Sequence, residues 1–370
     1  MSQLPMMLDS GYDIYLKSIW FLPFIYLGIF RFSTYLSKSL WILYLGTASI
    51  AVYCAICESV TGNHYLNIDV YNMAVSMMIA MISYSVYLNY NSENLLRNVA
   101  FMSMCGSMIL CYIIYTMYFT DYDIMSNIYA FKAKNSMGQI LLNCSIIIAL
   151  FLKTDNILIK YLKYFSIANI TVLLFLLKSR ATLVSFFFLV FYMVVQSKSK
   201  KIRWMTFGVL LLFVVYVLRN PHAYDVVVNG ILFAGRDVND INELSSERMV
   251  TFSEAVDIIS SNMWFGIGNK YLDSMPVAMV LQFGIVGASI VFSYIFKIYE
   301  TIKSYNRQIN IHLATYLLFI TMLLNSLFEA QPPFGPGVKC FMLWIMIGIS
   351  MACNDRGKLH VVLLDETKAE

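Results

Sequence analysis

Residues 219–273 read RNPHAYDVVVNGILFAGRDVNDINELSSERMVTFSEAVDIISSNMWFGIGNKYLD, and they form the one long polar stretch of the chain. On either side of this stretch the sequence consists of apolar runs joined by short links. A structureless loop longer than about 12–15 residues in a compact protein is usually either functional or disordered. We therefore expect this stretch to carry the function of the molecule.

The second half of the stretch predicts a short amphipathic helix. Ser245 or Ser246 can cap the helix, with Glu247 in its first turn. Gly266 and Gly268 then mark a turn. Apolar side chains that recur at helical spacing would line one face, against the membrane surface or the mouth of a helix bundle: Met249, Phe252, Val256 and Ile259.

Arg248 is unusual in this helix, because the helix dipole favours anions in the first turn. One interpretation is a solvated charge paired with Glu247 or Asp257. The other is that Arg248 and the free N–H groups of the first turn bind a phosphate-like anion. The residues alone leave both interpretations open.

Composition predicts the fold class. Of the 370 residues, 59% are hydrophobic and 13% are charged, whereas a soluble domain carries roughly 25% charged residues. We expect an all-α, polytopic transmembrane helical bundle with about eleven spans (about 10–12), each near the roughly 20 residues that a bilayer requires. The expected spans are 12–30, 39–59, 68–90, 96–119, 136–153, 157–178, 181–197, 202–219, 274–296, 311–329 and 337–353.

The spans form one expected integral membrane domain over residues 1–353, followed by a short cytoplasmic tail over 354–370. Short links rich in Lys and Arg stay in the cytoplasm. The basic clusters near residues 31–38, 153–163, 198–203 and 297–307 then share one side. This places the loop 219–273, between the eighth and ninth spans, on the outer, periplasmic or extracellular side.

The same orientation gathers several polar groups at the outer ends of spans. Lys and Arg are unusual there, because they are normally enriched in cytoplasmic loops. Each cation alone can be explained by snorkelling to the headgroups. As a set they favour a cationic pocket for an anionic lipid headgroup or a pyrophosphate. The groups are Lys132, Lys134, Asn135, Lys178, Arg180, Arg219, Arg236, Arg248 and Glu329.

We predict no metal site and no cofactor. The four histidines are scattered without metal-ligand spacing. Cys54 and Cys57 lie inside an apolar run, where small apolar side chains that fill space are the favoured interpretation over a redox or metal pair. The net charge of +4 is modest, and we expect no nucleic-acid partner.

Short patterns follow one another in a fixed order through the second part of the chain. They are Lys-Ala-Lys134-Asn135 with Gly138, Lys178-Ser-Arg180, Glu247-Arg248 with Glu254-Ala255 and Phe265-Gly266-Ile-Gly268, Gly284 with Gly287, and Phe328-Glu329 with Pro332 and Trp344. In their order and in their sides of the membrane, these patterns resemble the O-antigen polymerase and O-antigen ligase superfamily of bacterial cell-envelope glycosyltransferases. The resemblance covers roughly residues 135–348, and the amino-terminal third adds only its spans.

The chain departs from the ligases of that superfamily at one place. Ligases carry a His-Asn pair about a dozen residues before the Gly-Ile-Ile-Gly pattern, whereas this chain has Asp273-Ser274 there. Polymerase-type relatives often show Asp at this place. The resemblance therefore implies a polymerase that joins undecaprenyl-pyrophosphate-linked oligosaccharide repeats on the outer face of the bacterial inner membrane, with a chain-length regulator as a partner protein.

The chemistry of such a metal-independent glycosyltransferase assigns roles. We expect Arg180 and Arg248 to bind the leaving pyrophosphate, because the guanidinium fork stays protonated and binds phosphate bidentately. Lys132, Lys134 and Arg236 would assist, and Asn135 would orient one of them or cap the following span. Asp273, with Glu329 as second choice, would be the base for the acceptor hydroxyl. The simpler interpretations are an interfacial end of a loop for Asp273 and a salt bridge for Glu329.

Two other functions remain open. A ligase would transfer finished polymer to lipid A-core. A flippase or transporter of the same lipid-linked oligosaccharide would carry charged residues deep within its spans, whereas here they gather at one face.

Overall fold

The computed structural model describes residues 10, 19–66, 68–90, 92–119, 123, 134–196, 199–233, 236, 248–307, 309–329, 334 and 338–369. These residues form helices joined by turns, and none of them lies in a β-strand. The all-α prediction is therefore confirmed for the described part of the chain.

The helices follow one another with short links. In chain order they are α3 (Phe21–Phe30), α4 (Phe32–Tyr35), the 3₁₀ turn η1 (Lys38–Leu40), α5 (Trp41–Thr61), α6 (Ile68–Asn89), α7 (Ser92–Tyr118), α8 (Lys134–Phe151), α9 (Ile157–Leu176), α10 (Arg180–Gln196), α11 (Lys200–Arg219), α12 (Pro221–Tyr224), the π-helical η2 (Asp225–Leu232), α14 (Arg248–Ser261), α15 (Met275–Ser304), α16 (Asn310–Ser326) and α17 (Val338–Ala369).

The described residues include 6 helices that are long and apolar enough to cross a membrane, namely α5 with η1, α6, α7, α8, α9 and α15. A seventh span results if α11 and the helix pair α12–η2, which meet at a bend of 106°, count as one. The apolar helices α3, α10 and α16 are shorter than these. The protein has the helices of a multi-pass membrane protein, and the count of about eleven spans stays a prediction.

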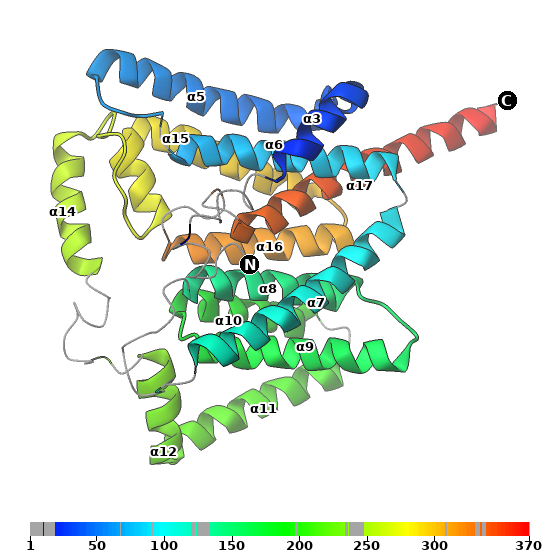
Figure 1. The fold of residues 1–370 in the computed structure, drawn as a ribbon, viewed down its shortest axis with the longest axis vertical. Helices are drawn as coiled ribbons and strands as arrows, with labels where there is room; N and C mark the ends of the chain where they lie inside the picture. Colours follow the sequence, from blue (N-terminus) through cyan, green and yellow to red (C-terminus); the bar gives the residue numbers. More distant parts are fainter. Residues whose placement is uncertain are drawn as a thin grey trace.

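Most of the long helices run side by side, and α14 lies across one end of them, at the left of Figure 1. We call this the loop end, because the turn 62–66 and the loop 262–274 meet there. The Tyr65 hydroxyl donates to the carbonyl oxygen of Gly266 over 2.9 Å at this end. Which side of a membrane this end faces stays a prediction.

The core forms where helices approach closely. α17 packs along α6, and the two helices approach closely at Gly348. A Cβ on Gly348 would stand 2.1 Å from the carbonyl oxygen of Ala80. Small residues at such contacts let the two backbones approach, which is how helices associate in a membrane.

Two details differ from the sequence-based expectation. In α14, the buried residue is Ala255, whereas Met249 and Val256 are 50% and 61% exposed. Phe252 and Ile259 do pack against the buried cluster as predicted, and the small Ala255 side chain allows the close contact with α15. The residues 354–369 of the expected cytoplasmic tail continue α17 to Ala369, and the location of the tail stays a prediction.

Candidate functional site

The site is built on a break in α15. Gly284 has φ 64° and ψ −176°, a conformation outside the helical region, so α15 consists of two helical parts joined at this residue. A break frees backbone groups that a bilayer cannot hydrogen-bond, and they need protein partners. The broken α15 therefore requires a second segment that supplies those partners.

The loop after α14 supplies them. The N–H groups of Ile267 and Gly268 donate to the carbonyls of Leu281 and Gln282 over 3.0 and 2.9 Å. In the other direction, the N–H of Ile285 donates to the carbonyl of Met263 over 2.9 Å. The two glycine patterns that the sequence shows separately are thus one structural unit.

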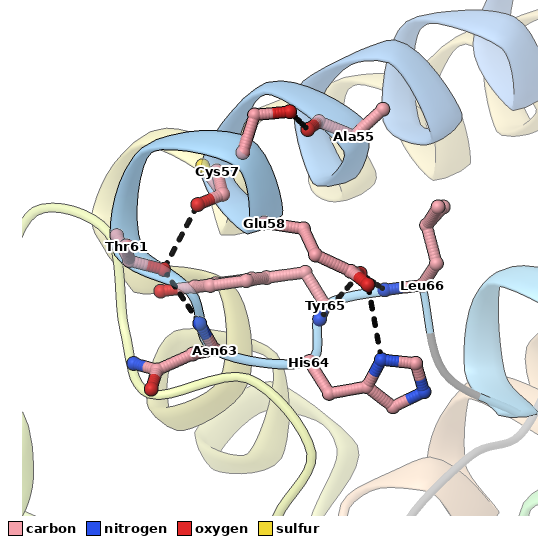
Figure 2. Close-up of polar contacts among 9 residues, drawn as sticks. Ala55, Cys57, Glu58, Thr61, Asn63, His64, Tyr65 and Leu66 are labelled. Carbon is pink, nitrogen blue, oxygen red and sulfur yellow. Dashed lines mark hydrogen bonds and ion pairs between the residues drawn. The ribbon is translucent and has the colours of Figure 1, made fainter.

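The turn between α5 and α6 holds this unit from the other side. Figure 2 shows the Glu58 carboxylate accepting hydrogen bonds from the N–H groups of Tyr65 and Leu66, over 3.1 and 2.9 Å, and lying 3.1 Å from Nδ1 of His64. The carbonyl of His64 in turn accepts from the N–H of Asn269 over 3.1 Å. Glu58 therefore orders the turn that contacts the glycine loop.

Four cations from separate parts of the chain act electrostatically on Lys134, the first residue of α8. They are, from the strongest, Arg236, Arg180, Lys178 and Arg248. Arg180 is the first residue of α10 and Arg248 is the first residue of α14. The sequence-predicted cations Lys134, Arg180, Arg236 and Arg248 are therefore brought together, and we call them, with Lys178, the cation cluster. Lys132 lies outside the described residues.

Asp273 lies beside this cluster. Its Oδ2 atom is 3.4 Å from Nη2 of Arg248, and its Oδ1 atom accepts a hydrogen bond of 2.6 Å from the Tyr271 hydroxyl. Partial desolvation, then the Asp273 carboxylate, raises the pKa of Tyr271, so its hydroxyl stays a donor. The Asp273 side chain is 38% exposed, which leaves it accessible to a substrate.

Arg248 pairs with Asp273, and among the described residues it makes no ion pair with Asp257. Its Nε atom is buried and has no hydrogen-bond partner among the described residues. Ser245, Ser246 and Glu247, the predicted cap and partner, lie outside the described residues. The available Nε supports the anion-binding interpretation of Arg248, since an unpaired buried donor is costly.

Glu329 occupies a more enclosed position. One carboxylate oxygen accepts from the side-chain amide of Asn135, and the other lies 3.4 Å from Nζ of Lys339. The Lys339 and Glu329 side chains are 4% and 12% exposed. The carbonyl of Glu329 also accepts from the N–H of Met275 over 2.9 Å, at the start of α15. This geometry is the salt bridge that is the simpler alternative to a role of Glu329 as the base.

Lys178 is held in an unusual conformation. It has a positive φ of 49° and is 2% exposed, at the link between α9 and α10. Its Nζ donates to the carbonyl of Asp123 over 3.2 Å. Burial lowers the pKa of Lys178. A non-glycine residue at positive φ costs about 1–2 kcal/mol, and such strain often accompanies function.

Sequence reasoning did not select Tyr271, Lys339 or Glu58 as site residues. Lys339 had a usable signal, because a lone lysine inside an apolar run is rare and usually paired. Tyr271 and Glu58 had none, although their partners are near in sequence, because no motif marks the Tyr271–Asp273 pair or the turn that Glu58 orders.

The described residues thus place a cation cluster, a partly exposed carboxylate and a buried ion pair at the loop end. No protein-family model matches the chain, and no curated protein matches it in sequence.

Proposed function

We propose that this protein is a polymerase that joins undecaprenyl-pyrophosphate-linked oligosaccharide repeats into O-antigen or capsule-like polysaccharide on the outer face of a bacterial inner membrane. In this proposal the loop end faces outward, in agreement with the positive-inside rule. The lipid-linked donor reaches the cation cluster at the membrane surface.

The observation that carries the proposal is the gathering of Arg180, Arg236 and Arg248 around Lys134, next to the Asp273 carboxylate. The cations come from segments far apart in sequence, and together they create a positive potential that attracts an anion. A pyrophosphate carries the opposite charge. Fixed donors aimed at developing negative charge are commonly worth 10²–10³ in rate each.

The reaction forms a bond between the acceptor hydroxyl oxygen and the anomeric carbon, while the bond from that carbon to the pyrophosphate oxygen breaks. Asp273 takes the hydroxyl proton, and the pyrophosphate leaves with the electron pair of the broken bond. Arg248 can hold Asp273 through Nη2 and a phosphate oxygen through Nε. One guanidinium would then hold the base and the leaving group at fixed positions relative to each other.

The test uses a strain that lacks the gene and carries Arg180→Lys, Arg248→Lys or Asp273→Asn. We expect each variant to leave single repeats on the cell surface, with long chains reduced by a factor of about 10². Arg31→Lys is the matched control, because Arg31 is exposed and belongs to the basic cluster near residues 31–38, which is expected on the opposite side of the membrane. Chains of normal length and amount in both arginine variants would exclude the proposed mechanism.

Loss of the whole protein separates the other two functions. A flippase defect leaves no repeats on the surface, and a ligase defect leaves finished polymer on the lipid carrier. Only single repeats on the surface agree with a polymerase.

A further inference from the structure

The end of the bundle opposite the loop end holds a cavity of about 460 Å³. It lies where the starts of α7 and α16 meet the end of α8. Its polar lining includes two cations and two amides, from Arg97, Lys153, Asn94 and Asn310. None of these residues takes part in the site at the loop end.

The backbone at this cavity adds positive potential. α16 begins after Ile309, whose side chain makes no capping hydrogen bond, and its first turn has no acidic residue. The N-terminus of a helix carries a partial positive charge and unpaired N–H groups. Ile309 and Asn310 both line the cavity, so this helix end lies beside Arg97 and Lys153.

The partial negative charge at the C-terminus of α8 is compensated by hydrogen-bond donors. The Lys163 ammonium donates to the carbonyls of Ala149 and Leu152, each over 3.0 Å. The Asn310 amide donates to the carbonyl of Leu150 over 3.3 Å. These contacts occupy carbonyl oxygens that would otherwise repel an anion. The Asn310 contact ties α16 to α8, and the Lys163 contacts tie α9 to the end of α8.

An apolar surface continues from the cavity along α7. Phe101 follows Arg97 by four residues and therefore lies on the same helix face, where it is 43% exposed. A ligand that satisfies both surfaces has an anionic head and an apolar chain. Lys and Arg near the cytoplasmic surface attract anionic lipids, and basic pockets between helices on that side bind their headgroups.

We propose that this cavity binds the phosphate of an anionic phospholipid headgroup, with Arg97 and Lys153 contacting the phosphate and an acyl chain lying along α7 at Phe101. The lipid would link α7, α8 and α16 at the end opposite the loop end. The inference is independent of the proposed polymerase activity.

The test measures the thermal stability of the purified full-length protein in detergent, with added phosphatidylglycerol, phosphatidylcholine or inorganic phosphate. Native mass spectrometry counts the retained lipid. The cavity variant is Arg97→Gln with Lys153→Gln. The matched control is Lys160→Gln with Lys200→Gln, which removes the same charge from exposed residues of α9 and α11 outside the cavity.

We expect phosphatidylglycerol to stabilise the wild type and the control, and the cavity variant to bind it roughly tenfold or more weakly. Full binding by the cavity variant, or an equal loss in the control, would overturn the proposal, since snorkelling cations would then explain the charges. Equal stabilisation by phosphatidylcholine or by inorganic phosphate alone would overturn the assignment to an anionic lipid.

Discussion

Gly266 and Gly284 face each other so closely that neither position has room for a side chain. A Cβ on Gly266 would stand 2.5 Å from the backbone nitrogen of Gly284, and a Cβ on Gly284 would stand 2.2 Å from the carbonyl oxygen of Trp264. Both residues also have positive φ, of 72° and 64°. The loop after α14 and the break in α15 therefore form only together.

We expect Gly284→Ala to cost about 2–5 kcal/mol, because the positive φ and the contact with backbone both oppose a side chain. Gly62→Ala is the matched control. Gly62 has φ 72° and nothing within 4 Å of the Cβ position, so only the conformational cost of about 1–2 kcal/mol applies. Thermal unfolding of the detergent-solubilised variants measures both. Equal losses would mean that the close approach has no energetic role.

Glu58 is expected to stabilise the glycine loop at a distance. Glu58→Ala leaves the N–H groups of Tyr65 and Leu66 without their carboxylate partner. Hydrogen exchange of the amides at Ile267 and Gly268 should then be faster, on the order of tenfold. His64→Ala is the control, because the His64 side chain is 70% exposed. Unchanged exchange in Glu58→Ala would show that the turn does not support the loop.

Substitution of Glu329 should mainly lower the stability of the protein, whereas substitution of Asp273 should mainly lower its activity. Removing one partner of a buried ion pair is strongly destabilising, so Glu329→Gln should cost about 3–5 kcal/mol. Adding Lys339→Met should recover part of this loss, because the lone charge is gone. Asp273→Asn affects a partly exposed pair and should cost below about 1 kcal/mol, while it removes the proposed base.

Thermal unfolding and polymer analysis on the same three variants test this separation. If Asp273→Asn were fully active and Glu329→Gln stable but inactive, the roles of the two carboxylates would have to be exchanged.

Lys178 is expected to lower the stability of the folded state. Replacement by glycine removes the cost of a positive φ. Glycine also loses more backbone entropy on folding, so we expect a net gain in the free energy of unfolding of about 0.5–1 kcal/mol. Polymer formation should fall nevertheless, because the variant removes one member of the cation cluster. A variant that is less stable than the wild type would contradict this account.

The pH dependence of the same variant gives a second measurement. Burial lowers the pKa of Lys178, so between that pKa and the unfolded value of about 10.4 the unfolded chain binds more protons at this residue. Stability therefore rises with pH across this window in the wild type. Lys178→Gly removes this contribution, and the stability advantage of the variant should shrink as the pH approaches 10.

The apolar runs predicted most helices closely. The expected spans 68–90 and 157–178 correspond to α6 (Ile68–Asn89) and α9 (Ile157–Leu176), because helix formation within a run of apolar residues is local. That α10 and α16, the expected spans 181–197 and 311–329, cross a bilayer stays a prediction, since each has 17 residues and crossing depends on neighbouring helices.

For the site, the sequence identified the cations but not the side chains that pair with one another. The charges at the ends of runs marked Lys134, Arg180, Arg236 and Arg248, and the alternation of spans predicted that they share one side. The pairing of Glu329 with Asn135 and Lys339, and of Asp273 with Arg248 and Tyr271, could not be predicted. The pairs of Glu329 with Asn135 and of Asp273 with Arg248 join residues from separate segments, and no local pattern encodes them.

The sequence by itself determined a helical membrane bundle and the end at which its polar groups collect, because hydropathy and helix length act over roughly 20 neighbouring residues. Only the tertiary structure decided that α15 breaks at Gly284 and that the loop after α14 supplies the missing hydrogen bonds. A break in a helix is tolerated in a membrane only where another backbone satisfies it, and that other backbone is placed by packing between distant parts of the chain.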